Sequence, residues 1–275
     1  MKIIDAHLHF CPGEPGYFSE IAVLAGHENT EKHLKKEYDR LGIRGGIVMG
    51  NRGLSLEEHE KYPEYLRYCI GLDSSYLGKY ETGIPGEVWD QMEAHLKRDT
   101  CVGIKLYPGY NRSYITDPVY GPVYELAAAF GKAVAVHTGE LAGANGLLKY
   151  CHPLTLDEAA SAYPTVRFVM CHFGNPWLPD AACVLHKNEN VWADLSGLLE
   201  GKVDLDTFFA EQKGYTDYLV TWIRYMGDYG RLLFGTDWPL ANLGDYVEFT
   251  KRIIPERYWE KVFGENAVEV YRLPW

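Results

Sequence analysis

The sequence lacks several features that would place it in a well-defined class of protein. Within its 275 residues, no apolar run approaches the ~20 residues that a membrane-spanning helix needs. No basic stretch followed by an apolar one marks a secretion signal near Met1. The six cysteines are scattered without a Cys-x-x-Cys pair, which excludes a dense disulfide framework. We therefore expect a cytoplasmic protein with no membrane partner.

Positive charge is also scarce. The chain carries 27 Lys and Arg against 38 Asp and Glu, and its net charge of −11 disfavours nucleic acid as a partner. No Gly-x-Gly-x-x-Gly or Walker-type loop is present, so no nucleotide cofactor is indicated. A small molecule is the expected partner. A homodimer is plausible, although no single feature of the chain requires one.

What the sequence does contain is a series of short apolar runs that alternate with helical segments. Apolar runs without polar alternation indicate strands buried on both faces, as in a parallel sheet. Eight such units in a chain near ~250 residues predict an α/β fold, a single (β/α)8 TIM barrel over residues 1–275, with an open doubly wound sheet as the alternative. The expected strands run from Ile3 to His9 and over residues 46–49, 67–72, 102–107, 133–137, 166–172, 191–196 and 231–237. Helices are expected over 30–41, 56–66, 89–98, 122–130, 155–163, within 204–229 and in the tail, with a long loop over 11–26.

The first candidate for chemistry is a pair of histidines at the end of the first predicted strand. His7 and His9 are two positions apart, so on a strand they point to the same face. Two imidazoles on one face can hold a divalent metal ion. The pair alone is close to what chance placement of ten histidines gives, so further ligands must come from other strands.

Four more polar residues stand at or near the ends of other predicted strands. Lys105 lies on the fourth strand and His137 ends the fifth. His172 ends the sixth and Asp237 the eighth. Because the carboxyl ends of barrel strands converge on one mouth, these side chains are expected to meet there. A single buried histidine, or an aspartate that closes a turn, can be structural, but the set predicts a metal site.

Seven segments in this order resemble the amidohydrolase superfamily of metal-dependent barrels. Their details resemble its amidohydrolase-2 branch, which includes aminocarboxymuconate-semialdehyde decarboxylase and related enzymes. The resemblance is specific to the superfamily and only weakly specific to a reaction. The matching segments are Ile4–His9, Gly103–Pro108, Val136–Gly139, Cys171–Trp177, Trp192–Gly197, Leu233–Pro239 and Gly264–Ala267.

The resemblance implies a principal divalent ion, with Zn²⁺ the leading candidate. Its implied ligands are His7, His9, His137 and Asp237, and Asp237 would also act as a base toward a water bound at the open position. A second ion is an open alternative, because His172 and Lys105 are further candidate ligands.

His172 and Lys105 each allow more than one role. His172 fits either a ligand to a second metal or a general acid/base beside a single ion. Lys105 fits three roles: a carbamylated bridge between two metals, as in some barrels of the superfamily, an unmodified contact to a substrate carboxylate, or a structural pair with an acidic neighbour.

Residues on loops around the predicted mouth are candidate substrate contacts. Arginine binds carboxylates bidentately, and aromatic rings can wall a planar substrate, although solvated arginines and buried aromatic packing explain such residues equally well. Asp194, on the seventh predicted strand, is a candidate to orient a histidine ligand. The substrate candidates are Arg52, Tyr107, Arg112 and Trp177.

These features predict a metal-dependent hydrolase. A metal-activated water would attack an amide, ester or lactone carbonyl of a small molecule, with Asp237 and His172 as catalytic residues. The alternative is a metal-dependent, non-oxidative decarboxylase of a small aromatic or unsaturated carboxylic acid, with His172 handling the proton. A barrel that binds a metal or a ligand without turnover is the third hypothesis.

Overall fold

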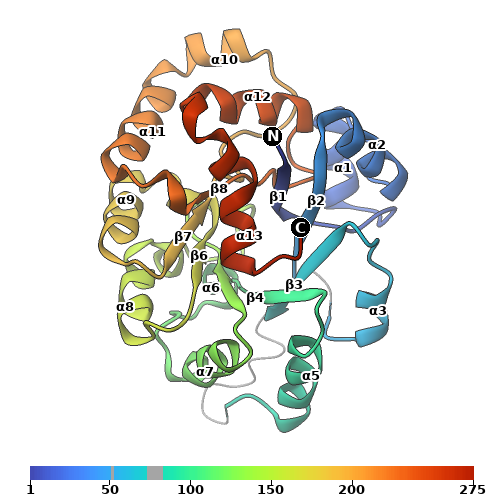
Figure 1. Ribbon diagram of the computed structural model, residues 1–275, viewed down its shortest axis with the longest axis vertical. Coiled ribbons are helices and arrows are strands. Elements are labelled where there is room, and N and C mark those ends of the chain that lie inside the picture. Colours follow the sequence, from blue (N-terminus) through green and yellow to red (C-terminus); the bar gives the residue numbers. More distant parts are fainter. Residues whose placement is uncertain (51–52, 73–82) are drawn as a thin grey trace.

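A computed structural model describes residues 1–50, 53–72 and 83–275 of the chain. Eight parallel strands form one sheet whose spatial order follows their order in the sequence, with helices around it (Figure 1). The predicted α/β TIM barrel is confirmed. The strands are β1 (Ile3–Leu8), β2 (Ile43–Met49), β3 (Leu66–Leu72), β4 (Cys101–Leu106), β5 (Ala133–Val136), β6 (Phe168–Met170), β7 (Val191–Asp194) and β8 (Leu232–Leu233).

Backbone hydrogen bonds between the first strand and the segment after the last one bring the two edges of the sheet together. The Ala6 N–H donates to the Phe234 carbonyl at 2.9 Å, and the His9 N–H donates to the Trp238 carbonyl at 2.7 Å. An open doubly wound sheet would leave these two edges apart, so the alternative fold is excluded. Closure also carries His9 to within reach of the residues after β8.

The helices form a layer outside the barrel (Figure 1). Residues 30–41 illustrate how the sequence sets their ends: Thr30 accepts a hydrogen bond from the His33 N–H at 3.2 Å, and Gly42 terminates α2 at φ 74°. The helices are α1 (Tyr17–Leu24), α2 (Glu31–Leu41), α3 (Leu56–Glu60), α5 (Gly86–Leu96), α6 (Pro108–Asn111), α7 (Gly121–Ala129), α8 (Leu154–Ala162), α9 (Leu178–Lys187), α10 (Leu205–Glu211), α11 (Lys213–Met226), α12 (Leu243–Ile253) and α13 (Asn266–Tyr271).

Three expectations about local structure were wrong. The helix expected over 56–66 ends at Glu60, and β3 already begins at Leu66. The segment 11–26 is not a continuous loop, because α1 forms within it and buries Ala22. Several strands also end earlier than predicted: β6 stops at Met170 and β8 at Leu233. His172 and Asp237 adopt left-handed backbone angles, with φ of 63° and 56°, which a strand ladder cannot accommodate. The polar residues therefore stand just beyond the strands.

The amino end of the barrel is closed by the C-terminal tail. Ile4, Val102 and Val270 belong to one buried apolar cluster that also includes Tyr271 and Leu273. In Figure 1, α13 and the C-terminus lie over this end of the barrel, close to the start of β1. A second, larger cluster fills the space between the barrel and the surrounding helices. No helix in the described ranges combines the length and apolarity that would let it cross a bilayer.

Candidate metal centre

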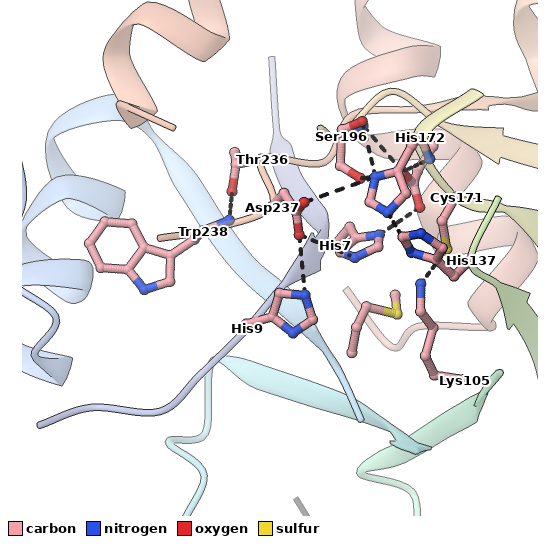
Figure 2. Close-up of polar contacts among 12 residues, drawn as sticks. His7, His9, Lys105, His137, Cys171, His172, Ser196, Thr236, Asp237 and Trp238 are labelled. Carbon is pink, nitrogen blue, oxygen red and sulfur yellow. Dashed lines mark hydrogen bonds and ion pairs between the residues drawn. The ribbon is translucent and has the colours of Figure 1, made fainter. Parts of the chain in front are cut away.

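Polar side chains from five strand ends line one cavity at the carboxyl end of the barrel. This cavity has a volume of about 540 Å³. The set is the one expected from the sequence, and Figure 2 shows these side chains directed toward one another. The residues are His7, His9, Lys105, His137, His172 and Asp237.

One group of candidate ligands consists of His7, His9 and Asp237. The Asp237 Oδ1 atom lies 3.4 Å from His7 Nε2 and 3.3 Å from His9 Nε2 (Figure 2). Burial lowers the pKa of His7 to about 4, so its imidazole is neutral. His7 Nδ1–H donates to Asp194 Oδ2 at 2.9 Å, which leaves the Nε2 lone pair facing the Asp237 carboxylate. Two acceptors facing each other are held apart by repulsion unless a cation lies between them.

The orphaned atoms of this group fit a metal ion. Both His7 Nε2 and Asp237 Oδ1 are buried without a hydrogen-bond partner, and such atoms are rare in folded proteins. Burial alone would raise the pKa of Asp237, but His7 together with His172 and His9 holds it well below its usual value. Neutral imidazoles and an ionised carboxylate are the ligand forms that Zn²⁺ and similar ions require. The donors of His7, His9 and Asp237 lie close enough to hold one ion.

Asp194 on β7 connects the group of His7, His9 and Asp237 to His172. While its Oδ2 atom accepts from His7, its Oδ1 atom accepts from the His172 N–H at 3.0 Å and from the Ser196 hydroxyl at 2.5 Å. Burial opposes ionisation of Asp194, but the attraction of His7 lowers its pKa below the ordinary value. A carboxylate behind a histidine ligand fixes both the tautomer and the ring orientation of that ligand.

His137 and His172 form a second pair beside the first group. His137 Nδ1 lies 3.2 Å from His172 Nε2. The Ser196 hydroxyl gives its proton to Asp194, so it accepts from His172 Nδ1–H at 2.9 Å. His137 Nε2–H in turn donates to the Glu140 carbonyl at 2.9 Å. Each ring therefore turns a lone pair toward the other, and a shared proton or a cation is needed between them.

His137 is thus joined to the group of His7, His9 and Asp237 through His172. Its predicted role as a ligand of the principal ion stays a prediction.

Comparison with known proteins identifies the family. Residues 80–273 match the family model described as Amidohydrolase, the amidohydrolase-2 model. The chain belongs to the amidohydrolase-2 family. This match begins after His7 and His9, so those two residues are connected to the family by the fold and by the geometry above. A search of the curated proteins finds no match.

Solved structures with the same fold cover nearly the whole chain. An uncharacterised TIM-barrel protein from Bordetella bronchiseptica is 20% identical, with a TM-score of 0.70 over 98% of both chains. A probable 2-pyrone-4,6-dicarboxylic acid hydrolase from Acinetobacter baumannii is 17% identical, with a TM-score of 0.65 over 99% of this chain and 100% of its own. A 2,6-dihydroxybenzoate decarboxylase from Rhizobium is 16% identical, with a TM-score of 0.64 over 98% of both chains. These likenesses establish the TIM-barrel fold.

Lys105 occupies the floor of the amidohydrolase cavity. Its side chain is fully buried, and its ammonium lies 2.7 Å from Cys171 Sγ and 5.3 Å from the centre of the Tyr107 ring. It forms no ion pair with any carboxylate in the described part of the chain, so the predicted acidic partner is not found there. A carbamylated bridge and a substrate contact both stay predictions.

Of the residues predicted to contact substrate, some line the cavity and others do not. Tyr107 lines the cavity, and its hydroxyl donates toward the carbonyls of Met49 and Gly50 at 3.3 Å. Arg112 is exposed and donates to the Asn145 carbonyl at 3.0 Å, while Trp177 packs with its ring centre 4.9 Å from that of His152. Neither Arg112 nor Trp177 lines the cavity. Arg52 lies outside the described residues. Substrate binding by these four residues stays a prediction.

The sequence reasoning missed several residues of the site. Tyr17 and Phe18 line the cavity from α1, a helix that the glycine- and proline-rich composition of its surroundings concealed. Ser196 was missed although it stands two positions after Asp194, a spacing that could have singled it out. Asp5, two positions before His7, accepts from the Thr236 hydroxyl at 2.6 Å and from the Tyr38 hydroxyl at 2.8 Å. Asp5 thereby supports both segments that carry the candidate ligands.

Proposed function

We propose that this amidohydrolase-family member is a hydrolase that uses a divalent ion, Zn²⁺ first among the candidates, to cleave an amide, ester or lactone carbonyl of a small molecule. The observation that carries the proposal is the position of Asp237 Oδ1, 3.4 Å from His7 Nε2 and 3.3 Å from His9 Nε2, in a cavity that all three residues line. In this proposal residues 1–275 act as one catalytic domain in the cytoplasm.

The proposed mechanism assigns a task to each side chain around the group. A bound divalent ion supplies Lewis acidity, which polarises a carbonyl and lowers the pKa of water. Asp237 is ionised and accepts the proton of the attacking water. His172 Nε2 lies 3.2 Å from His137 Nδ1, and a proton shared by these two atoms is the one that His172 would deliver to the leaving group. Lys105 contributes positive charge near the developing oxyanion.

Decarboxylation is the second candidate function. A specific observation supports it: the buried Lys105 ammonium has no described carboxylate partner and adjoins a wall that contains Tyr107 and Tyr110. A planar acid would find both a cation and aromatic surfaces there. One of the structural neighbours above is a decarboxylase of an aromatic acid. In this function His172 would deliver its proton to carbon.

Two measurements test the proposal. Elemental analysis of protein purified without chelator is expected to find one or two divalent ions per chain, and protein without any would contradict both metal-dependent functions. A panel of amides, esters, lactones and unsaturated acids would then be scored for hydrolysis product and for CO₂. Release of CO₂ without hydrolysis product would replace the hydrolase by the decarboxylase.

A further inference from the structure

The cavity above the candidate metal centre continues into a second lobe. The aromatic lobe, about 540 Å³, is defined by Phe18, Tyr107, Tyr110 and Lys105. The acidic lobe, about 690 Å³, is defined by Glu140, Asn175, Glu200 and Gln212. His137, His172 and Asp237 line both lobes. A substrate whose reacting carbonyl lies at these shared residues therefore extends into two different environments.

The acidic lobe offers two carboxylates and no compensating cation. No lysine or arginine of the described ranges lines it, and neither Glu140 nor Glu200 forms an ion pair with a described residue. Burial, followed by the nearby charges of Asp237 and Glu140, raises the pKa of Glu200. A positively charged ligand group beside Glu200 would oppose this shift and favour the ionised carboxylate.

One side chain that lines the acidic lobe has an unpaired acceptor. The Asn175 side-chain oxygen is buried without a hydrogen-bond partner, and Asn175 lines the lobe. A ligand group that donates a hydrogen bond to this oxygen would satisfy an acceptor that the protein itself leaves unpaired.

The backbone fixes both glutamates relative to the centre. The Glu140 N–H donates to the Asn175 carbonyl at 2.9 Å, and the Glu140 carbonyl accepts from His137. Next to Glu200, the Gly201 N–H donates to the carbonyl of Leu240 at 2.8 Å, and Leu240 also lines both lobes. The backbone at Glu140 and beside Glu200 is thus held by residues that line the lobe.

The two lobes share the Asp237 carboxylate and otherwise differ in charge. Lys105 places a buried ammonium in the aromatic lobe, which disfavours a second cation there and suits an acyl group that becomes a carboxylate. Glutamates at the acidic lobe disfavour an anion and suit an amine. A substrate with an aromatic acyl part and an amine part can satisfy both lobes in one orientation only.

We propose that the substrates are amides of a small aromatic acid with a positively charged amine, and that Glu140 and Glu200 bind the amine portion. This inference rests on the proposed hydrolytic function. In the reaction the C–N bond of the amide breaks and a bond forms between the acyl carbon and the water oxygen. A water proton passes to the nitrogen, the amine leaves in the acidic lobe, and the acid remains on the side of Lys105.

The test compares two probes of nearly equal size, N-(2-aminoethyl)benzamide, which is cationic, and neutral N-propylbenzamide. Their binding to the full-length, metal-containing protein is measured by titration calorimetry. The wild type is expected to bind the cationic amide roughly tenfold more tightly, the size expected of contacts to two partly exposed carboxylates. In the double variant Glu140→Gln, Glu200→Gln the ratio is expected to fall toward one. Glu256→Gln, which lies outside both lobes, is the matched control and is expected to keep the wild-type ratio.

Equal binding of the two amides by the wild type, a preference that the double variant retains, or no binding of either amide would overturn the inference. Hydrolysis of the probes is scored separately. A tenfold binding preference without any hydrolysis would contradict the hydrolytic function and leave the acidic lobe as a cation subsite. Hydrolysis of both amides with equal affinity would support the hydrolase and overturn the proposed role of the two glutamates.

Discussion

The two ends of the barrel bury opposite kinds of side chain. At the amino end, Ile4, Val102 and Val270 pack into a continuous apolar cluster sealed by the C-terminal tail. At the carboxyl end, His7 and Asp237 are almost as deeply buried, yet each has a polar atom without a hydrogen-bond partner. An unsatisfied buried polar group costs about 1–3 kcal/mol. The carboxyl end therefore lowers the stability of the metal-free fold, and the rest of the core offsets that cost.

This difference predicts which property each end controls. Replacing a residue at the carboxyl end should reduce activity far more than stability, because the side chain contributes little to packing. Replacing a residue at the amino end should do the reverse. This contrast would be contradicted if variants at either end of the barrel changed activity and stability together.

The largest expected effect is that of Asp237→Asn. The amide cannot accept a proton and is a weaker metal ligand, so we expect kcat/KM to fall by ~10³-fold or more, on the order of 4 kcal/mol. Because the neighbouring histidines favour the ionised form of Asp237 in the folded chain, the free energy of unfolding of metal-free protein should fall, but by less than for a truncation in the apolar core. Steady-state kinetics and urea unfolding measure the two. Asp39→Asn, at an exposed ion pair on α2, is the control, and more than a tenth of wild-type activity in Asp237→Asn would contradict its assignment.

At the amino end, Tyr271→Ala is expected to reduce stability by ~3–5 kcal/mol, as large aromatic truncations in cores do. Tyr271 is 3% exposed in the apolar cluster, and its hydroxyl has no hydrogen-bond partner. Tyr271→Phe keeps the ring and removes only this hydroxyl, so its stability should lie within ~1 kcal/mol of the wild type. Urea unfolding and metal analysis are the measurements. A loss of bound metal in folded Tyr271→Ala would show that the two ends are coupled.

Asp194→Asn should have a smaller effect, confined to metal affinity. Asp194 orients His7 through a 2.9 Å hydrogen bond and does not reach the cavity lining. Loss of such a partner costs ~10–100-fold in metal affinity, or ~1.4–2.8 kcal/mol. Competition with a chromophoric chelator measures it. Ser196→Ala, which removes a donor to the same carboxylate and leaves His7 in place, should change the affinity less. Equal losses in the two variants would argue against the orienting role of Asp194.

The same contrast explains how far sequence reasoning could go. Apolar strands spaced along the chain predict a barrel, because strands buried on both faces need helices around them. Residues at strand ends such as His137 and His172 could be expected at one mouth because the topology brings every strand end there. Their grouping near His7 follows from the fold and needs no detailed knowledge of side-chain contacts.

What the sequence could not predict depends on hydrogen bonds between distant segments. Whether His137 faces Asp237 or His172 depends on the Glu140 carbonyl and the Ser196 hydroxyl, and neither contact follows from spacing. The left-handed angles of His172 and Asp237 likewise end their strands for reasons of tertiary structure. Helix α1 was missed because its eight residues form between two glycines and bury little apolar surface of their own.

One source of acid sensitivity is expected outside both ends of the barrel, at a histidine in the surrounding layer of helices. His95 on α5 is fully buried; its Nε2–H donates to the Leu54 carbonyl at 3.0 Å and its Nδ1 accepts from the Tyr68 hydroxyl at 2.9 Å. Burial lowers its pKa to about 4, against ~6.5 in the unfolded chain. Between these values the unfolded state binds a proton that the folded state does not.

Stability should therefore rise with pH from about 4 to about 6.5 and be lost as pH falls through that window, with a contribution from His95 of up to ~1.4 kcal/mol per pH unit. His95→Gln can keep a donor and an acceptor but does not titrate, so its free energy of unfolding should depend less steeply on pH over this range. Urea unfolding at half-unit steps of pH measures the slope, and His186→Gln, at an exposed position on α9, should keep the wild-type slope. Identical slopes in all three proteins would mean that the acid sensitivity lies elsewhere, with the buried histidines of the carboxyl end as the next place to look.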